Sequence, residues 1–323
     1  MKIVFMGTGD FAVPSLEALH GAGHPIGLVV SQPDRPQGRG LALRPTPVKA
    51  AAERLGLEIF QPEKLRLDPD RVIAERADVL VVVAYGQILR ENILECAPRG
   101  AINVHASLLP KYRGAAPIQW AIANGETRTG VTTMQLDRGM DTGPILLQQD
   151  CPIAADDTTS SLEPRLAALG ARLLLETLER LTAGSIVPIP QDEAAASKAP
   201  LIRKSDGVVE FTRPAAETAN RLRGFSPWPG AQFTHEGRLI KILSAHEVER
   251  PASSVAGSVT GVSREGIDVA CGRGTTLRLV RVQPESRGPV SAFDFANGAK
   301  LRPGTILGSP PGTLASGPTA PKD

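Results

Sequence analysis

The fold is indicated most clearly by the apolar run Asp78-Val79-Leu80-Val81-Val82-Val83-Ala84. A strand covered on both faces carries such an uninterrupted run because neither face meets water, as in the centre of a parallel sheet. Outward from this run, apolar segments alternate with helical ones, which predicts an open, doubly wound, Rossmann-like α/β sheet. The expected strands are residues 2–6, 26–30, 78–84, 101–105, 130–135 and 145–149, and the expected helices are 14–20, 47–55, 116–124 and 162–181, with Pro164 in the first turn of the last helix.

The pattern changes after a Pro- and Ala-rich stretch at residues 186–197. Beyond it, short apolar segments separated by glycine-containing turns are typical of a small OB-like β-barrel. The expected strands are 207–211, 231–234, 238–243, 258–262, 267–270 and 275–282, with one helix at 215–223. The sequence therefore predicts an α/β domain over 1–187, a linker over 188–204, an OB-like domain over 205–308 and a disordered tail over 309–323.

The composition is that of a water-soluble globular chain, with 41% hydrophobic and 22% charged residues among 323. No apolar stretch approaches the roughly 20 residues that a membrane helix needs. Because the net charge is only +2, an anionic partner has to be bound by a local cluster of cations. The three widely spaced cysteines, Cys96, Cys151 and Cys271, favour a reducing compartment over a disulfide framework or a zinc site. We expect a cytoplasmic protein that uses no metal.

Polar side chains mark the end of the expected strand 101–105. Asn103 and His105 are two residues apart, so the period of a strand places both on one face. A candidate third member is Asp141, in the glycine-flanked turn Asp137-Arg138-Gly139-Met140-Asp141-Thr142-Gly143, with Asp137 as its rival. An amide, an imidazole and a carboxylate suit the attack of a nucleophile on a carbonyl, since they can donate to the oxyanion, move a proton and orient the imidazole.

The segment Asn103–Gly114 resembles the N-x-H-x-S-L-L-P-x-x-R-G signature of the folate-dependent formyltransferases, and Asp137–Gly143 resembles their second motif, D-x-G-x-D-T-G. The resemblance selects Asp141 over Asp137. It implies transfer of a formyl group from 10-formyltetrahydrofolate to an amine, with Asn103 and His105 beside the formyl oxygen. Asp141 would keep His105 oriented and protonated, or accept the proton of the amine. Ala106 stands where glycine is common in the family.

Further stretches, at residues 4–11, 32–40, 45–49, 84–86 and 225–229, are similar to the methionyl-tRNA formyltransferases within that family. This resemblance implies a monomer that formylates the α-amine of methionyl initiator tRNA for translation initiation. The α/β domain would be catalytic, and the OB-like domain would bind tRNA. The residues implied in folate binding are Ser107, Leu108, Leu109, Pro110, Val82, Ala84 and Tyr85.

Basic residues gather in the loop at residues 31–49, which carries Arg35, Arg39, Arg44 and Lys49 against Asp34. By resemblance, this is the loop that tests the acceptor stem of the initiator tRNA, with Arg39 at its tip. Guanidinium groups suit phosphates and base edges. Leu41 and Ala42 replace expected lysines, which weakens the electrostatic part of this contact. Arg203 and Lys204 are predicted to contact tRNA from the C-terminal domain.

Several alternatives compete with this interpretation. The run Gly7-Thr8-Gly9-Asp10-Phe11-Ala12 is similar to the dinucleotide fingerprint G-x-G-x-x-G/A, but Asp10 would lie beside the pyrophosphate, which disfavours a nicotinamide-dependent oxidoreductase. A formyltransferase for a sugar-nucleotide or purine-intermediate amine, a 10-formyltetrahydrofolate hydrolase, and an RNA-binding protein with a relict folate site remain open. The small-substrate transferases are expected to lack the C-terminal barrel.

Overall fold

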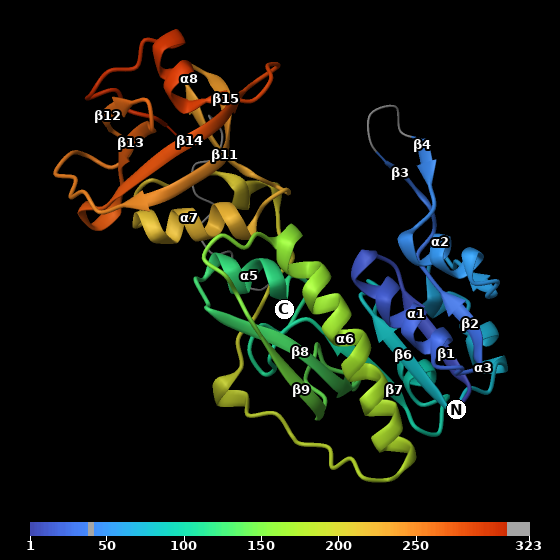
Figure 1. Ribbon diagram of the computed structural model, residues 1–323. Coiled ribbons are helices and arrows are strands. Elements are labelled where there is room, and N and C mark those ends of the chain that lie inside the picture. Colours follow the sequence, from blue (N-terminus) through green and yellow to red (C-terminus); the bar gives the residue numbers. More distant parts are fainter. Residues whose placement is uncertain (38–41, 309–323) are drawn as a thin grey trace. The chain divides into compact units, whose positions relative to one another are not determined.

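The computed structural model describes residues 1–37 and 42–308, which form two compact units (Figure 1). The first unit comprises Met1–Ile118, Arg128–Ile153 and Ser161–Pro200, and the second comprises Gln119–Thr127, Ala154–Ser160 and the chain from Leu201 onward. Arg39, in the predicted tRNA loop, and the predicted disordered tail lie outside the described residues. No helix in the described part of the chain is both long and apolar enough to cross a bilayer.

The first unit is built on a seven-stranded sheet in the order β5-β2-β1-β6-β7-β8-β9. Five of its strands are parallel, and β1 and β6 are buried along their whole length, as the apolar run predicted. The strands are β1 (Ile3–Gly7), β2 (Ile26–Val30), β5 (Ile59–Phe60), β6 (Val79–Val83), β7 (Ala101–His105), β8 (Arg128–Gln135) and β9 (Ile145–Pro152). The Rossmann-like α/β fold is confirmed.

The edge formed by β8 and β9 is antiparallel. The connection between these two strands, residues 136–144, is too short for the crossover that parallel neighbours require. β8 also runs against β7, so the loop after β8 starts beside the amino end of β7, where the Leu136 amide donates to the Ala101 carbonyl at 2.8 Å. This reversal determines which loop can reach the site.

The position of the site follows from the order of the strands. β1 and β6 are neighbours, yet the chain proceeds from β1 to β2 on one side and from β6 to β7 on the other. Open α/β sheets bind ligands beyond the carboxyl ends of their strands at such a switch point. Asn103 and His105 lie at the carboxyl end of β7, next to β6.

Helices cover the sheet, and α6 (Thr159–Thr182) is the longest of them (Figure 1). It packs closely on β7 and β8 at Gly170, where a Cβ would lie 2.8 Å from the side chain of Val104. The prediction for Pro164 was wrong: the helix starts at Thr159, so the proline lies inside it and not in its first turn. The other helices are α1 (Val13–Gly21), α2 (Pro47–Arg54), α3 (Asp70–Ala74) and α4 (Glu91–Leu94), whereas most residues of α5 (Pro117–Ala123) belong to the second unit.

A short hairpin, β3 (Arg35–Gln37) and β4 (Ala42–Arg44), projects from the first unit (Figure 1). The strands of this hairpin were not predicted, because they are short, polar and not part of the main sheet. They carry part of the basic loop, and the register places Arg35 directly opposite Arg44.

The second unit is an antiparallel sheet in the order β10-β11-β14-β13-β12, with β15 beside β14. Residues 305–308 bridge its two edges, since they pair with Thr234 of β10 and with residues 257–259 next to β12. The elements are α7 (Ala215–Gly224), β10 (Ala231–His235), β11 (Arg238–Val248), β12 (Val259–Ser263), β13 (Gly266–Ala270), β14 (Thr276–Pro284), β15 (Val290–Ser291) and α8 (Ala292–Gly298).

One predicted strand of this unit, 207–211, was wrong. The chain forms a 3-10 helix at Lys204–Gly207 and then a single bridge from Val208 to Gln232. The Asp206 carboxylate accepts a hydrogen bond from the Arg203 amide at 2.6 Å and so closes a turn where a strand was expected.

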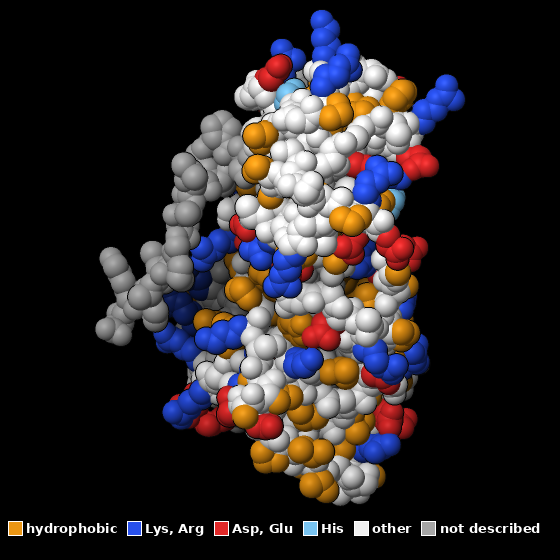
Figure 2. All heavy atoms as spheres, turned by 90° about the vertical axis from the view of Figure 1, so that its left-hand side faces the viewer, with side chains coloured by type: hydrophobic (Ala, Val, Ile, Leu, Met, Phe, Trp, Pro, Cys, Tyr) orange, Lys and Arg blue, Asp and Glu red, His pale blue; other side chains and the backbone are white. Residues whose placement is uncertain are grey.

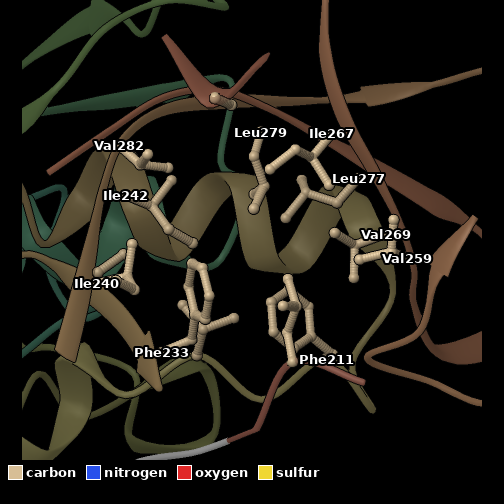
Figure 3. Close-up of a cluster of buried hydrophobic side chains, with 14 of the residues drawn as sticks. Phe211, Phe233, Ile240, Ile242, Val259, Ile267, Val269, Leu277, Leu279 and Val282 are labelled. Atoms are coloured by element: carbon tan, nitrogen blue, oxygen red, sulfur yellow. The ribbon is translucent and has the colours of Figure 1, made fainter. Parts of the chain in front are cut away.

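The core of the second unit consists of aliphatic side chains around a pair of phenylalanines (Figure 3). Phe233 is fully buried, and its ring meets that of Phe211 edge to face with 6.1 Å between centroids. Ile240, Ile242 and Leu279 line the same cluster. Alternate residues of β10 and β11 face this core, which explains the period-two pattern of the sequence.

We expect Phe233→Ala to lower the free energy of unfolding of the second unit by about 3–5 kcal/mol, because it removes a buried ring and leaves a cavity. Both tryptophans, Trp120 and Trp228, belong to this unit, so tryptophan fluorescence during urea unfolding measures it. Leu243→Ala is the control, since this side chain on β11 is 41% exposed and its removal should cost less than about 0.5 kcal/mol. Equal effects of the two substitutions would contradict this core.

Candidate active site

The three predicted catalytic side chains converge. Asn103 and His105 project from one face of β7, and Asp141 comes from the loop between β8 and β9. The Asp141 Oδ1 lies 3.5 Å from Asn103 Nδ2, and its Oδ2 lies 3.6 Å from His105 Nδ1. His105 is buried and Asp141 is half-buried, so water screens the Asp141 carboxylate only weakly at the position of His105.

The loop that carries Asp141 is held from the segment after β7. The Gly114 amide donates to Asp141 Oδ2 at 2.8 Å. Asp141 has a φ of 55°, in the left-handed region that Asp and Asn tolerate better than most residues. Its rival Asp137 is exposed and holds the turn together, because its carboxylate accepts hydrogen bonds from the Thr142 hydroxyl and the Gly139 amide.

His105 is held by a hydrogen bond at one ring nitrogen and faces a carboxylate with the other. Nε2 lies 2.9 Å from the carbonyl oxygen of Tyr112, which can only accept, so Nε2 donates to it. Nδ1 lies 3.6 Å from the Asp141 carboxylate, beyond hydrogen-bond distance. Asn103 Nδ2 carries a second hydrogen besides the one that faces Asp141, and this hydrogen can be donated to a developing oxyanion.

The loop after His105 is fixed by Thr132 of β8. The Thr132 hydroxyl donates to the Ser107 carbonyl at 2.7 Å and accepts from the Leu109 amide at 3.1 Å. The Leu109–Pro110 peptide bond is cis. Ser107 is fully buried, and its hydroxyl donates to the Lys111 carbonyl, so its side chain serves the loop itself.

The predicted folate residues divide into buried and accessible ones. Ser107, Leu109, Val82 and Tyr85 are all buried, so their side chains support the site from beneath. Leu108 and Pro110 are half-buried and Ala84 is exposed, and these three present apolar surface at the ends of β6 and β7. This combination of an apolar ledge and backbone polar groups suits a flat, polar-edged ring such as a pteridine.

Tyr85 does not present its side chain to a ligand. It packs in the apolar cluster under β6, where burial raises the pKa of its phenol to about 12. Its carbonyl accepts hydrogen bonds from Thr8 Oγ1 at 2.8 Å and Gln32 Nε2 at 2.9 Å. The Gly7-Thr8-Gly9 turn, which resembled a phosphate-binding loop, thus fixes the backbone at the end of β6.

Two of the predicted tRNA-binding cations already have partners. Lys49 Nζ lies 2.6 Å from Asp34 Oδ2, and Arg35 pairs with Glu63 at 3.1 Å. Hydrogen bonds from Gln61 and then from Lys49 lower the pKa of Asp34, and Asp34 in turn raises the pKa of Lys49. Lys49 therefore serves first to anchor the base of the loop.

Three of the other predicted cations are exposed. Arg44 on β4, and Arg203 and Lys204 before α7, form no ion pair with any residue that the structure describes. Figure 2 shows Lys and Arg side chains interspersed with Asp and Glu over the face that is drawn. Contacts to an anionic partner therefore depend on particular arginines and lysines and not on a general field.

The sequence patterns missed one group of site residues, in the segment assigned to the linker. Gln191 Nε2 donates to the carbonyls of Asp141 and Gly143, and its Oε1 accepts from Arg113 Nε. Arg113 also forms a two-pronged ion pair with Glu193, which raises the pKa of Arg113 and lowers that of Glu193 through these hydrogen bonds. The Pro-Gln-Asp-Glu stretch has no periodicity that could have revealed these contacts.

Residues 1–178 match the formyl transferase domain, and residues 201–300 match the formyl transferase C-terminal domain. The chain is 53% identical over 308 residues to the methionyl-tRNA formyltransferase of Anaeromyxobacter sp. (strain K), covering 94% of this chain and 98% of that protein. It is 49% identical over 311 residues to the enzyme of the same name from Solibacter usitatus, covering 95% and 99%. The chain belongs to the formyl transferase family.

Solved structures of formyl transferases share the fold. The N-formyltransferase of Helicobacter canadensis, in complex with folinic acid and dTDP-3-aminofucose, matches with a TM-score of 0.66 at 18% identity, over 88% of this chain and 99% of its own. This finding corrects the expectation that small-substrate transferases lack a C-terminal domain, because the match extends well beyond the first unit. A glycinamide ribonucleotide transformylase from Symbiobacterium toebii covers only 59% of this formyl transferase chain, with a TM-score of 0.50.

We expect Asp141→Asn to keep the fold of this formyl transferase and to lower the single-turnover rate of formyl transfer by about 100-fold or more, because the carboxylate that faces His105 and Asn103 is lost. Asparagine tolerates the left-handed backbone, and its amide oxygen can still accept from Gly114. The matched control is Asp137→Asn in the same loop, which should change the rate by less than about twofold. Equal reductions in both variants would assign the effect to the loop and not to the carboxylate of Asp141.

Proposed function

We propose that this chain transfers the formyl group of 10-formyltetrahydrofolate to the α-amine of methionyl initiator tRNA, giving N-formylmethionyl-tRNA. The observation that carries the proposal is the convergence of Asn103, His105 and Asp141 at the end of β7. It occurs in a chain that is 53% identical, over nearly its whole length, to a methionyl-tRNA formyltransferase.

In the proposed reaction the methionine amine attacks the formyl carbon. The Asn103 amide donates a hydrogen bond to the formyl oxygen as it becomes negatively charged, and His105 donates a second one from Nε2, which exchanges its hydrogen bond to the Tyr112 carbonyl for one to this oxygen. The new carbon–nitrogen bond forms, the bond to the folate nitrogen breaks, and tetrahydrofolate leaves with a proton on that nitrogen. Asp141 orients His105 and accepts, through water, the proton that the amine loses.

The folate donor fits the accessible ledge of Ala84, Leu108 and Pro110, beside the reacting groups. A HypX structure from Aquifex aeolicus in complex with tetrahydrofolic acid shares this fold, with a TM-score of 0.55. In the proposal, the side chains of this ledge contact the flat face of the ring. Backbone N–H and C=O groups at the ends of β6 and β7 form hydrogen bonds with its polar edge.

For tRNA, the proposal assigns phosphate contacts to the exposed cations Arg44, Arg203 and Lys204, with Arg39 on the same loop as Arg44. Arg35 and Lys49 contribute while keeping their carboxylate partners. We propose a monomer that works in the cytoplasm, where its three unpaired cysteines are stable as thiols.

The deciding experiment compares formyl transfer to charged initiator and charged elongator methionyl-tRNA. We expect kcat/KM for the initiator to be higher by about 100-fold or more, because only the correct acceptor stem makes the contacts that complete the site. Release of tetrahydrofolate without formylated tRNA would reject this acceptor and favour the hydrolase or a transferase for another amine.

Salt dependence tests the phosphate contacts. We expect the double variant Arg203→Ala, Lys204→Ala to bind initiator tRNA more weakly than the wild type. The slope of log Kd against log salt concentration should fall by about one unit for each phosphate that these side chains no longer neutralise. Arg54→Ala is the control, since the Arg54 guanidinium is already paired with Glu17. A double variant with the wild-type slope would remove these two residues from the tRNA interface.

A further inference from the structure

The segment at residues 189–199, here called the brace, forms backbone hydrogen bonds with the segment after β7 and with the start of β9. Ile189 exchanges both backbone hydrogen bonds with Ile145 at 2.8 Å, at the start of β9. Further on, the Arg113 amide donates to the Ser197 carbonyl at 2.8 Å, and the Ala199 amide donates to the Arg113 carbonyl at 2.7 Å. The brace therefore contacts both the segment after β7 and the strand that follows the Asp141 loop.

The brace passes so close to the site loop that only glycine fits at position 114. A Cβ on Gly114 would lie 2.6 Å from the Ala199 carbonyl oxygen, and its φ of 122° also favours glycine. Gly114 is the residue whose amide donates to Asp141 Oδ2. One end of the brace thus fixes the donor that orients the Asp141 carboxylate.

Gln191, in the middle of the brace, fixes the backbone of Asp141 itself. Its Nε2 donates to the Asp141 carbonyl at 2.8 Å and to the Gly143 carbonyl at 2.7 Å, which uses both hydrogens of the amide. Its Oε1 accepts from Arg113 Nε at 3.0 Å. The amide therefore cannot rotate without breaking hydrogen bonds at both ends.

Arg113 anchors Gln191 from the other side. Its guanidinium is bound to Glu193 by hydrogen bonds of 2.9 and 2.7 Å, so the orientation of Nε toward Gln191 is set. The chain of interactions runs from Glu193 through Arg113 and Gln191 to the carbonyl of Asp141. It joins residues that are far apart in the sequence, in the site loop, the Asp141 loop and the brace.

We propose that Gln191 is a positioning residue for formyl transfer and that it acts through Asp141. Gln191 touches the carbonyl of Asp141 and not the reacting groups, so its contribution is to hold the carboxylate where it faces both His105 and Asn103. A displacement of about 1 Å in a catalytic group can cost about 100-fold in rate. The inference rests on the proposed function only for the choice of assay.

The test uses Gln191→Met, which keeps the length of the side chain and removes every hydrogen bond. We expect the single-turnover rate to fall by about 10- to 100-fold, while KM for the folate and for the tRNA stays within about twofold. Gln149→Met is the matched control, because Gln149 is exposed on β9 and its side chain bonds to its neighbour Asp150, away from the site. It should retain the wild-type rate.

A double-mutant cycle separates positioning from general structure. If Gln191 acts through Asp141, Gln191→Met should cost less than about twofold when Asp141→Asn is already present. Equal slowing in both backgrounds, an effect confined to KM, or no slowing in the single variant would each overturn the proposal. If the wild-type chain uses an acceptor other than methionyl-tRNA, the proposed function fails, and the same cycle is measured on the acceptor that it does use.

A second measurement is independent of activity. Hydrogen–deuterium exchange of the peptides that contain Gly114 and residues 137–143 should be faster in Gln191→Met than in Gln149→Met, because the loop is no longer held by the brace. Unchanged exchange in both peptides would also overturn the proposal.

Discussion

The hydrogen bond from the Gly114 amide to the Asp141 carboxylate is the interaction on which the candidate site depends. β8 runs against β7, so the loop after β8 begins at the amino end of β7, away from His105. Asp141 must therefore reach back along the strand, and the Gly114 amide is the donor that meets it there. The strand order sets where the chemistry can occur, and this bond holds the carboxylate of the third group beside the other two.

The site concentrates charge in a place with little water. His105 is 5% exposed, lies between a carbonyl and a carboxylate, and has Asn103 on the same strand face. Because the strand and the two loops fix these groups beside one another, little rearrangement is needed during the reaction, which is the main advantage of such a site over solution. The buried members of the predicted folate-binding segment, Ser107 and Leu109, contribute by keeping the loop in place.

The parts of the fold that the sequence predicted are those with a local signal. β6 and β7 follow from apolar runs, and Asn103 and His105 follow from the period of a strand and a family signature. The β3–β4 hairpin and the 3-10 helix at Lys204–Gly207 have no such run. The contacts of Gln191 could not be predicted for a different reason. They are hydrogen bonds with residues 48 to 78 positions away, and no local sequence pattern encodes them.

The register of the β3–β4 hairpin has a consequence for the stability of that hairpin. Arg35 and Arg44 lie directly opposite each other on the two strands, where like charges repel. Glu63 balances Arg35, while Arg44 has no carboxylate partner among the residues that the structure describes. An anion bound beside Arg44 would relieve this repulsion, so anion binding would stabilise the pairing of the two strands.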